Sequence, residues 1–347
     1  MSQFHDDPAR SLLDWYAHAR RDLPWRRTRD PYRLWIAEAM LVQTTVTAVL
    51  PYYERFLARF PDLSSLAAAP LDDVLKAWEG LGYYARARHL HRAAQQVMAQ
   101  HGGQLPADPI ALRALPGVGE YMAAALGSMA FGRDELALDA NVRRVLARLF
   151  LIAVGTRQER AELRRRGEAL LPRGCAGDFN QALMDLGAAV CTPRRPRCLT
   201  CPLAPHCLAH AAGDPEAVPP RPRRRALPHY DVAAAVIRHD DGRLLIAQRP
   251  EDGLLGGLWE FPGGKCEPGE TPAECVRREI REELALEIEV GPLLTTVQHG
   301  YTHFSITLHA YLCRLGACGE PRAIGCRAWR WVRTEELDDY AFSAADR

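Results

Sequence analysis

Residues 115–132 read LPGVGEYMAAALGSMAFG, and the chain continues with LDANV at 138–142. Gly117 and Gly119 occupy alternate positions between two helical stretches, so the backbone can turn tightly and direct free amide groups outward. The start of a helix after such a turn suits a phosphate oxygen. On its own, this turn is more often a plain helix connection, and an aspartate such as Asp139 before a helix is ordinarily an N-cap. Whether this turn binds a phosphate or only connects two helices therefore depends on the sequence around it.

The sequence around this turn is helical from residue 11 to residue 210. Apolar residues recur at three- and four-residue spacing in 12–20, 32–60 and 71–100, and proline or glycine separates these stretches. No strand pattern precedes residue 228. We expect an all-α domain over residues 1–210.

The chain changes character at residues 211–228, AAGDPEAVPPRPRRRALP. Five prolines and four arginines cannot pack a core and favour an extended linker. Residues 232–250 then indicate two strands joined by an Asp-Gly turn, residues 271–286 indicate a helix, and further strands follow. We expect an α/β domain over residues 229–347.

Composition is that of a globular protein, with 347 residues of which 48% are apolar. No apolar run is long enough for a membrane span, and the N-terminus lacks the pattern of a secretory signal. An intracellular protein is then expected, and its ten cysteines are not expected to form disulfides. The net charge is +8 over residues 1–228 and −7 over the rest, so the first part is suited to a polyanion, although a basic domain can also bind a protein.

Four cysteines lie within seventeen residues with the spacing C-x6-C-x2-C-x5-C. They are Cys191, Cys198, Cys201 and Cys207. Four thiolates can bind a structural zinc ion or an iron–sulfur cluster, and spacing alone does not exclude zinc. Cys175 lies outside the pattern and is expected to be an ordinary thiol.

Glu38 lies in the apolar segment WIAEAML at 35–41. A carboxyl group among apolar side chains tends to have a raised pKa, which allows it to hold a proton near neutral pH. If the helix turns Glu38 toward solvent, this inference fails.

These motifs together resemble the MutY-type adenine DNA glycosylases of the helix-hairpin-helix and endonuclease III superfamily. The resemblance covers the first 210 residues and includes LPW at 23–25, the segment around Glu38, the glycine turn, Asp139 and the cysteine spacing. It implies a [4Fe–4S] cluster, a base flipped out of double-stranded DNA, and excision of adenine mispaired with 8-oxoguanine or guanine. Glu38 would protonate the adenine, and Asp139 would stabilise the oxocarbenium-like sugar.

The resemblance also assigns residues that contact DNA or the base. Gln43 matches a wedge that fills the gap left by the flipped base, and Tyr83 matches an intercalating tyrosine. Asn141 is grouped with the catalytic residues, and further matches are Trp25, Arg26, Gly117, Gly119 and Gln181. One departure is Val42, which stands where the family usually has a glutamine.

The nearest rival is an endonuclease III-type lyase, which needs a lysine just after the hairpin to form a Schiff base. This chain has Tyr121 at that position. A tyrosine cannot form the imine, but it can hydrogen-bond near the reacting sugar or simply pack in the core. We expect a glycosylase without lyase activity.

The C-terminal region resembles a Nudix domain, because residues 264–286 match the Nudix box at every fixed position except Ala285, where glycine is usual. Glu279, Glu282 and Glu283 share one helix face and are candidate Mg²⁺ ligands. The segment HGYTH at 299–303 resembles the loop that reads 8-oxoguanine in MutY-type proteins, with Tyr301, Thr302 and His303 as candidate contacts. Two roles stay open for this domain: reading the lesion, and hydrolysing a nucleotide such as 8-oxo-dGTP. We expect a monomer in the bacterial cytoplasm or nucleoid.

Overall fold

The computed structural model describes residues 7–152, 157–220, 226–316 and 319–347. Its contacts divide the chain into two compact units. The helical unit comprises Met1–Ala67 and Arg92–Arg223, and the sheet unit comprises Ala68–His91 and Arg224–Arg347. Within the expected linker, residues 221–225 lie outside the described residues. In the described part of the chain, no helix combines the length and apolar character that crossing a membrane requires.

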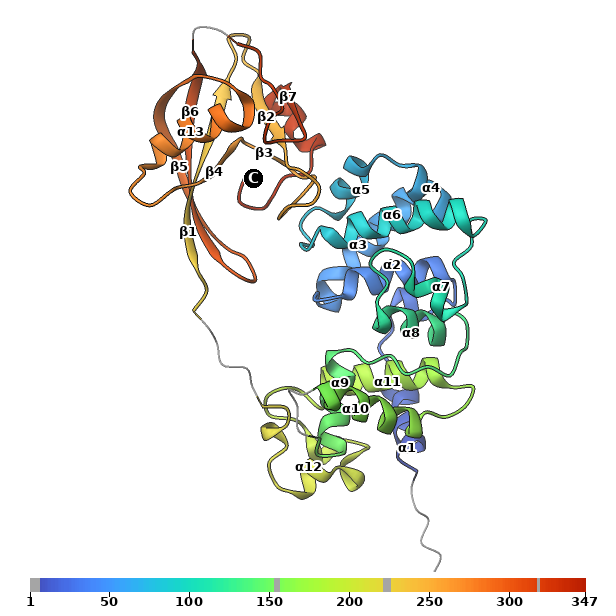
Figure 1. Ribbon diagram of the computed structural model, residues 1–347. Coiled ribbons are helices and arrows are strands. Elements are labelled where there is room, and N and C mark those ends of the chain that lie inside the picture. The colour runs from blue at the N-terminus through green and yellow to red at the C-terminus, as the bar shows by residue number, and fades with distance from the viewer. Residues whose placement is uncertain (1–6, 153–156, 221–225, 317–318) are drawn as a thin grey trace, which may run out of the picture. The chain divides into compact units, whose positions relative to one another are not determined.

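The helical unit confirms the all-α prediction (Figure 1). Its helices are α1 (Pro8–Ala19), α2 (Pro31–Leu41), α3 (Val46–Arg59), α4 (Leu63–Ala68), α7 (Pro109–Arg113), α8 (Glu120–Met129), α9 (Ala140–Leu149), α10 (Arg157–Leu170), α11 (Ala176–Ala189) and α12 (Leu208–Ala211). Helix α6 (Ala85–Gln100) begins in the sheet unit and ends in the helical one.

Helix α2 is buried on nearly every side, and it therefore places Glu38 inside the protein. Asp30 caps its first turn and Pro31 starts it, as a proline without an N–H can. A helix that is apolar all round belongs in a core, and residues 34–40 of α2 are all buried. The polar position at Glu38 is therefore an exception that requires an explanation.

The sheet unit contains one mixed seven-stranded sheet. Its strands are β1 (His229–Arg238), β2 (Leu244–Gln248), β3 (Trp259–Glu260), β4 (Gly263–Lys265), β5 (Ile288–Gly300), β6 (Ser305–Leu315) and β7 (Ala328–Val332). The path runs β3-β2-β1-β6-β5, with β4 paired to β1 and β7 to β2. Only the β1–β6 pair is parallel among these pairings. The predicted hairpin around the Asp-Gly turn forms, since Arg238 faces Leu244.

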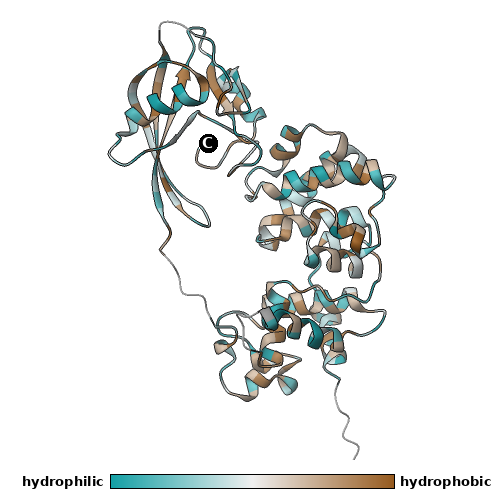
Figure 2. Cartoon of the chain, in the orientation of Figure 1, coloured by the Kyte–Doolittle hydropathy of each residue, from teal (hydrophilic) through white to brown (hydrophobic). Residues whose placement is uncertain are grey.

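Helix α13 (Pro272–Leu284) contains most of the Nudix box and packs on the sheet (Figure 1). It begins with a capping box in which Thr271 and Glu274 bond each other's backbone N–H. Ile280 and Leu284 face the core, while charged residues give the helix its hydrophilic colour in Figure 2. Ala285 ends it at φ 53° and ψ 34°, the left-handed conformation that the usual glycine adopts more easily.

Helix α5 (Leu71–Trp78) belongs to the sheet unit through specific contacts that the sequence did not predict. Lys76 Nζ donates to the Tyr340 carbonyl at 2.9 Å, and the Gln248 amide donates to Asp72 at 2.7 Å. The backbone N–H of Phe342 donates to Glu79 at 2.9 Å. These bonds join residues more than 170 positions apart, which no local pattern records.

Candidate active site

The glycine turn forms a hairpin between α7 and α8. Gly117 has φ +77°, which a side chain would strain, and Gly119 is the N-cap of α8. A Cβ added at Gly119 would meet no atom within 4 Å, so this end of α8 is open. The turn can therefore present backbone N–H groups to an anion, as the sequence predicted.

A pocket of about 420 Å³ lies within the helical unit. We call it the helical pocket. Its walls bring together residues from α2, α8, α9 and α11 that are far apart in the sequence. Seven of the predicted residues line it: Trp25, Arg26, Glu38, Tyr121, Asp139, Asn141 and Gln181. The size is within the range of small-ligand sites, about 300–1,000 Å³.

Glu38 lies inside this pocket and only 4% of its surface is exposed. The pKa of its carboxyl group is raised to about 7: burial is the main cause, the hydrogen bond from Tyr121 and the charge of Arg26 oppose it, and the charge of Asp139 adds to it. The alternative of a solvent-facing Glu38 is wrong. A group with this pKa can hold a proton at neutral pH and release it to a substrate.

Asp139 caps α9 and also lines the helical pocket, which are the positions that its two predicted roles require. One oxygen accepts the Val142 N–H at 2.6 Å and so caps α9, and the other accepts the Asn141 amide at 3.2 Å. The carboxyl group also lines the helical pocket. Burial raises its pKa, while these two donors and Arg144 lower it. The cap therefore holds the carboxyl group in place toward the pocket.

Tyr121 donates a hydrogen bond from its hydroxyl to Glu38 Oε2 at 2.6 Å. Burial and the two nearby carboxyl groups raise the pKa of this phenol well above its ordinary value, so it stays protonated. Tyr121 is thus neither a simple core residue nor a solvent-facing one. It orients the candidate acid.

Arg26, which lines the helical pocket, is held by a residue that the sequence reasoning missed. Asp185 in α11 is 2% exposed and forms ion pairs with Arg26 and with Arg21. Gln181, one turn earlier, accepts a hydrogen bond from Tyr16 at 3.0 Å, and Trp25 packs edge-on against Tyr53 at 5.2 Å. An aspartate within an apolar helix was the available signal for Asp185.

Gln43 and Tyr83, the predicted wedge and intercalating residues, share an unusual backbone conformation. Their φ angles are 60° and 50°, where residues other than glycine are rare. Gln43 is exposed in the helical unit, and Tyr83 is 38% exposed in the sheet unit. Strained backbone of this kind is concentrated at functional positions.

The four cysteines form a loop beside the core of the helical unit. All are free thiols, and Cys191, Cys201 and Cys207 pack against the cluster that contains Leu146 and Leu186. Burial, followed by the proximity of the other thiols, raises the pKa of Cys198. In the described parts of the chain, no group of three or more His, Cys, Asp or Glu side chains is arranged to hold a metal ion.

Arg148 organises this loop and was also missed. It is 2% exposed and donates to the carbonyls of Thr192 at 2.7 Å and Val218 at 2.7 Å, and to Cys191 Sγ at 3.3 Å. A buried guanidinium requires several acceptors, and the backbone of the loop supplies them. Val218 belongs to the expected linker, so the first part of that linker is fixed to the loop.

The predicted reading loop lies at the end of β5 in the sheet unit. Thr302 and His303 are exposed, and the hydroxyls of Thr302 and Tyr83 are hydrogen-bonded at 2.7 Å. Tyr301 is half-buried and stacks on Phe304, with ring centroids 4.7 Å apart. Two residues assigned separately from the sequence thus meet within one unit.

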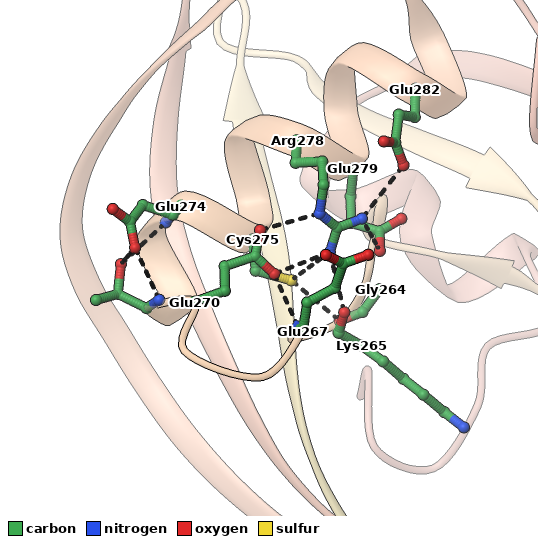
Figure 3. Close-up of polar contacts among 10 residues, drawn as sticks. Gly264, Lys265, Glu267, Glu270, Glu274, Cys275, Arg278, Glu279 and Glu282 are labelled. Carbon is green, nitrogen blue, oxygen red and sulfur yellow. Dashed lines mark hydrogen bonds and ion pairs between the residues drawn. The ribbon is translucent and has the colours of Figure 1, made fainter.

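The Nudix box is held by Arg278 (Figure 3). Its guanidinium pairs with Glu270 at 2.9 Å, with Glu279 at 2.8 Å and with the exposed Glu282 at 3.2 Å. Glu279 lies against Gly264, where a Cβ would meet its carboxyl carbon at 2.3 Å. Glu283 is separate: one of its oxygens, Oε2, is buried without a hydrogen-bond partner. Burial and the charge of Glu279 raise the pKa of Glu283 to about 7.

Residues 36–172 match the HhH-GPD superfamily of base excision DNA repair proteins, and residues 233–347 match the NUDIX domain. Among solved structures, a thermostable thymine-DNA glycosylase is 33% identical and aligns with a TM-score of 0.55 over 59% of this chain and 95% of its own. A complex of endonuclease III with DNA aligns with a TM-score of 0.52 at 24% identity over 59% of this chain and 94% of its own, which shows the shared fold. The chain is thus a glycosylase of the helix-hairpin-helix class with a C-terminal Nudix domain.

Curated relatives give the particular family. The adenine DNA glycosylase of Homo sapiens is 35% identical over 96% of this chain and 72% of its own length. That of Buchnera aphidicola subsp. Acyrthosiphon pisum is 31% identical over 88% of this chain and 85% of its own. The chain belongs to the adenine DNA glycosylase family. The predicted fold class and enzyme class are confirmed.

Proposed function

We propose that the protein excises adenine mispaired with 8-oxoguanine or guanine in double-stranded DNA. The observation that supports this most is the pair of buried carboxyl groups, Glu38 and Asp139, in one pocket. Adenine is a poor leaving group unless a ring nitrogen is protonated, and its loss leaves positive charge on the sugar. One acid near pKa 7 and one carboxylate held by N–H donors meet these two demands.

In the reaction, the flipped adenine enters the helical pocket and Glu38 transfers its proton to a ring nitrogen. The N-glycosidic bond breaks, its electrons remain with adenine, and Asp139 stabilises the cationic sugar. Water then bonds to the anomeric carbon and loses a proton to the carboxylate of Glu38. Tyr121 binds one oxygen of Glu38, so the other oxygen is the one that exchanges the proton.

Strand cleavage is not part of this reaction. A lyase needs an amine that can attack the sugar, and position 121 supplies a phenol that is already bonded to Glu38. The product is therefore an intact abasic site, and borohydride should trap little covalent complex. Strand cleavage concerted with base loss would favour the endonuclease III-type reaction instead.

Gln43 fills the space left by the adenine, and Tyr83 intercalates beside the opposite base. The hydrogen bond between Tyr83 and Thr302 supports assigning both to the same base pair. Thr302 and His303 then contact 8-oxoguanine, while Tyr301 supports the loop from within. The hairpin at Gly117 and Gly119 binds a phosphate of the DNA.

The relatives of this class support a [4Fe–4S] cluster bound by Cys191, Cys198, Cys201 and Cys207. A cubane takes one thiolate for each iron, so its ligands are spread more widely than the ligands of one ion. Four partly buried thiols fit this donor set, and burial together with the neighbouring thiols raises the pKa of Cys198, Cys201 and Cys207. The cluster would fix the loop that carries Arg194, Arg195 and Arg197 toward a DNA backbone. We place the protein with the chromosome in the cytoplasm, acting as a monomer.

The decisive assay is single-turnover cleavage of duplexes with adenine opposite 8-oxoguanine, guanine or thymine. We expect fast excision opposite 8-oxoguanine, slower excision opposite guanine and little opposite thymine. Equal rates for the three duplexes would contradict the proposed substrate.

A second candidate function is hydrolysis of a nucleoside triphosphate at the Nudix box. It is favoured by Ala285, which takes the left-handed conformation at the end of α13 despite its side chain, and by the unpaired oxygen of Glu283. With Mg²⁺ at Glu279, Glu282 and Glu283, a water oxygen would bond to phosphorus as the bridging P–O bond breaks. Pyrophosphate would leave with the bond electrons, and a carboxylate would accept the proton from water.

Magnesium-dependent release of pyrophosphate from 8-oxo-dGTP by the full chain tests this activity. Glu283→Gln should abolish the release, and Glu287→Gln, at an exposed carboxylate near the end of the same helix, should not. Release no faster than that of Glu283→Gln would leave the domain as a reader of the lesion only.

A further inference from the structure

The sheet unit contains a pair of thiols that has no part in the excision reaction or in lesion reading. Cys266 follows β4 directly, and its backbone N–H donates to the Asp231 carbonyl of β1 at 2.9 Å. Cys275 lies near the start of α13 and is fully buried. Its thiol donates a hydrogen bond to the sulfur of Cys266. The pair therefore connects the end of a strand to the helix that packs on the sheet.

A buried cysteine is ordinarily a small apolar side chain that fills space in a core. Cys313 and Cys326, which belong to the same core, fit that description, since each thiol donates to a backbone carbonyl, at 3.6 and 4.0 Å. Cys275 differs because its partners include a second thiol. Two thiols that already contact each other can be linked by oxidation without a large movement of the backbone. This contact distinguishes Cys266 and Cys275 from a merely structural pair.

The two thiols differ in reactivity. Burial raises the pKa of both, and the hydrogen bond between them then lowers the pKa of Cys266 and raises that of Cys275 further. The thiolate is the reactive form of a cysteine, so Cys266 reacts first. Cys266 is also partly exposed, whereas Cys275 is buried. An oxidant therefore reaches Cys266, and Cys275 is in position to react with the oxidised sulfur.

We propose that Cys266 and Cys275 form a redox-active dithiol, which a peroxide converts to a disulfide. The Cys266 thiolate attacks one oxygen of hydrogen peroxide: the S–O bond forms, the O–O bond breaks, and the departing hydroxide is protonated to water. The Cys275 thiol then loses its proton and attacks the sulfur of Cys266, so that the S–S bond forms and the S–O bond breaks with release of a second water. Two thiols are oxidised and one peroxide is reduced.

The disulfide would act on the Nudix box from inside the fold. The thiol of Cys275 donates to the Gly264 carbonyl at 3.6 Å, and its sulfur accepts from Arg278, which also pairs with Glu270 (Figure 3). Oxidation removes the hydrogen that Cys275 donates and closes residues 266–275 into a covalent loop. A cross-link reduces the number of open conformations of the segment that it closes. The box segment would therefore open less often in the oxidised protein, whether or not the domain hydrolyses a nucleotide.

Mass spectrometry of the full-length protein tests the proposal directly. Trypsin cuts after Lys265 and Arg277, so both thiols fall in one peptide, 266–277. After treatment with hydrogen peroxide, the protein is denatured and its free thiols are blocked with iodoacetamide. We expect this peptide to carry no alkyl group and to be about 2 Da lighter than the dithiol form, because two hydrogens are lost. Dithiothreitol should restore two thiols that iodoacetamide alkylates.

Hydrogen exchange measures the consequence for the box segment. Amide exchange within residues 266–275 should be at least about threefold slower in the oxidised protein than in the reduced one. Cys266→Ser cannot form the disulfide, so its exchange should not change with peroxide, and any effect of peroxide on the cysteine loop is the same in both proteins. Cys326→Ser, at another partly buried cysteine of the same core, is the matched control and should still form the disulfide.

Three results would overturn the proposal. The first is a peptide 266–277 that keeps two thiols at a peroxide concentration that oxidises the exposed Cys175. The second is a sulfinic acid at Cys266 while Cys275 is still alkylated. The third is a disulfide from Cys266 or Cys275 to a different cysteine. The peptide mass is measured on the unaltered protein, so it decides even if a variant fails to fold.

Discussion

At the scale of single residues, Glu38 makes the excision rate depend on pH. Its pKa of about 7 results from burial, and only the protonated form can donate to adenine. The single-turnover rate constant should be highest below pH 7 and fall about tenfold per pH unit above it. Tyr121→Phe removes a hydrogen bond that lowers this pKa, so the inflection should move to higher pH. A rate that stays constant from pH 6 to pH 9 would remove Glu38 from the role of acid.

Substitutions at Asp139 can separate its effect on the excision rate from its effect on the stability of the fold. Asparagine caps a helix about as well as aspartate, so Asp139→Asn should retain the hydrogen bond to Val142 and change the unfolding temperature little. Without the negative charge, the excision rate should fall about 10²- to 10³-fold. Asp139→Ala should lose both the rate and about 1 kcal/mol of stability. Thermal unfolding and single-turnover kinetics on the same samples check this, and near-normal excision by Asp139→Asn would exclude an electrostatic role.

At the scale of elements, the cysteine loop should depend on iron. Purified protein should be brown, with a broad absorbance in the visible region, and Cys198→Ser or Cys201→Ser should lose iron and unfold at lower temperature. Cys175→Ser is the control, because Cys175 is exposed and outside the loop. Stoichiometric zinc without iron in anaerobically prepared protein would show that the four cysteines bind a structural zinc ion instead.

The sequence predicted those site residues that lie in recognisable motifs. Glu38, Tyr121 and Asp139 were assigned from short segments, and the structure brings them into one pocket. Asp185 and Arg148 were missed because no motif marks them and their partners are distant in the chain: Arg26 is 159 residues from Asp185, and Thr192 is 44 residues from Arg148. Burial of Glu38 was likewise open, since an apolar segment does not say which way its one polar residue points.

At the scale of the whole molecule, lesion reading should depend on the link between Tyr83 and Thr302. Deleting residues 229–347 is a poor test, because it would remove the partners of Asp72, Lys76 and Glu79. Thr302→Ala is sharper: it should reduce the preference for 8-oxoguanine over guanine by roughly two- to tenfold, the value of one hydrogen bond. Excision opposite guanine should persist. Thr296→Ala, at an exposed threonine of β5, is the control, and an unchanged preference in Thr302→Ala would remove this residue from lesion reading.

For residues 68–91, the sequence predicted the local structure but not the unit to which they belong. Local periodicity predicted these residues as helical, and α5 is a helix. Their membership in the sheet unit depends on hydrogen bonds to residues such as Gln248 and Tyr340, which are distant in the chain. Tyr83 therefore belongs to the same unit as the loop that we propose reads the opposite base.

The helix cap at Asp139 has a consequence for inheritance. Because asparagine preserves the cap, a cell that carries an Asp139→Asn gene copy beside an intact one would accumulate a folded protein whose proposed DNA contacts are unchanged. Such a protein would occupy the damaged sites without clearing them and would compete with the functional copies. An allele that truncates the chain would only halve the amount of enzyme. The milder-looking change of one atom in Asp139 would therefore be the dominant one, and the truncation recessive.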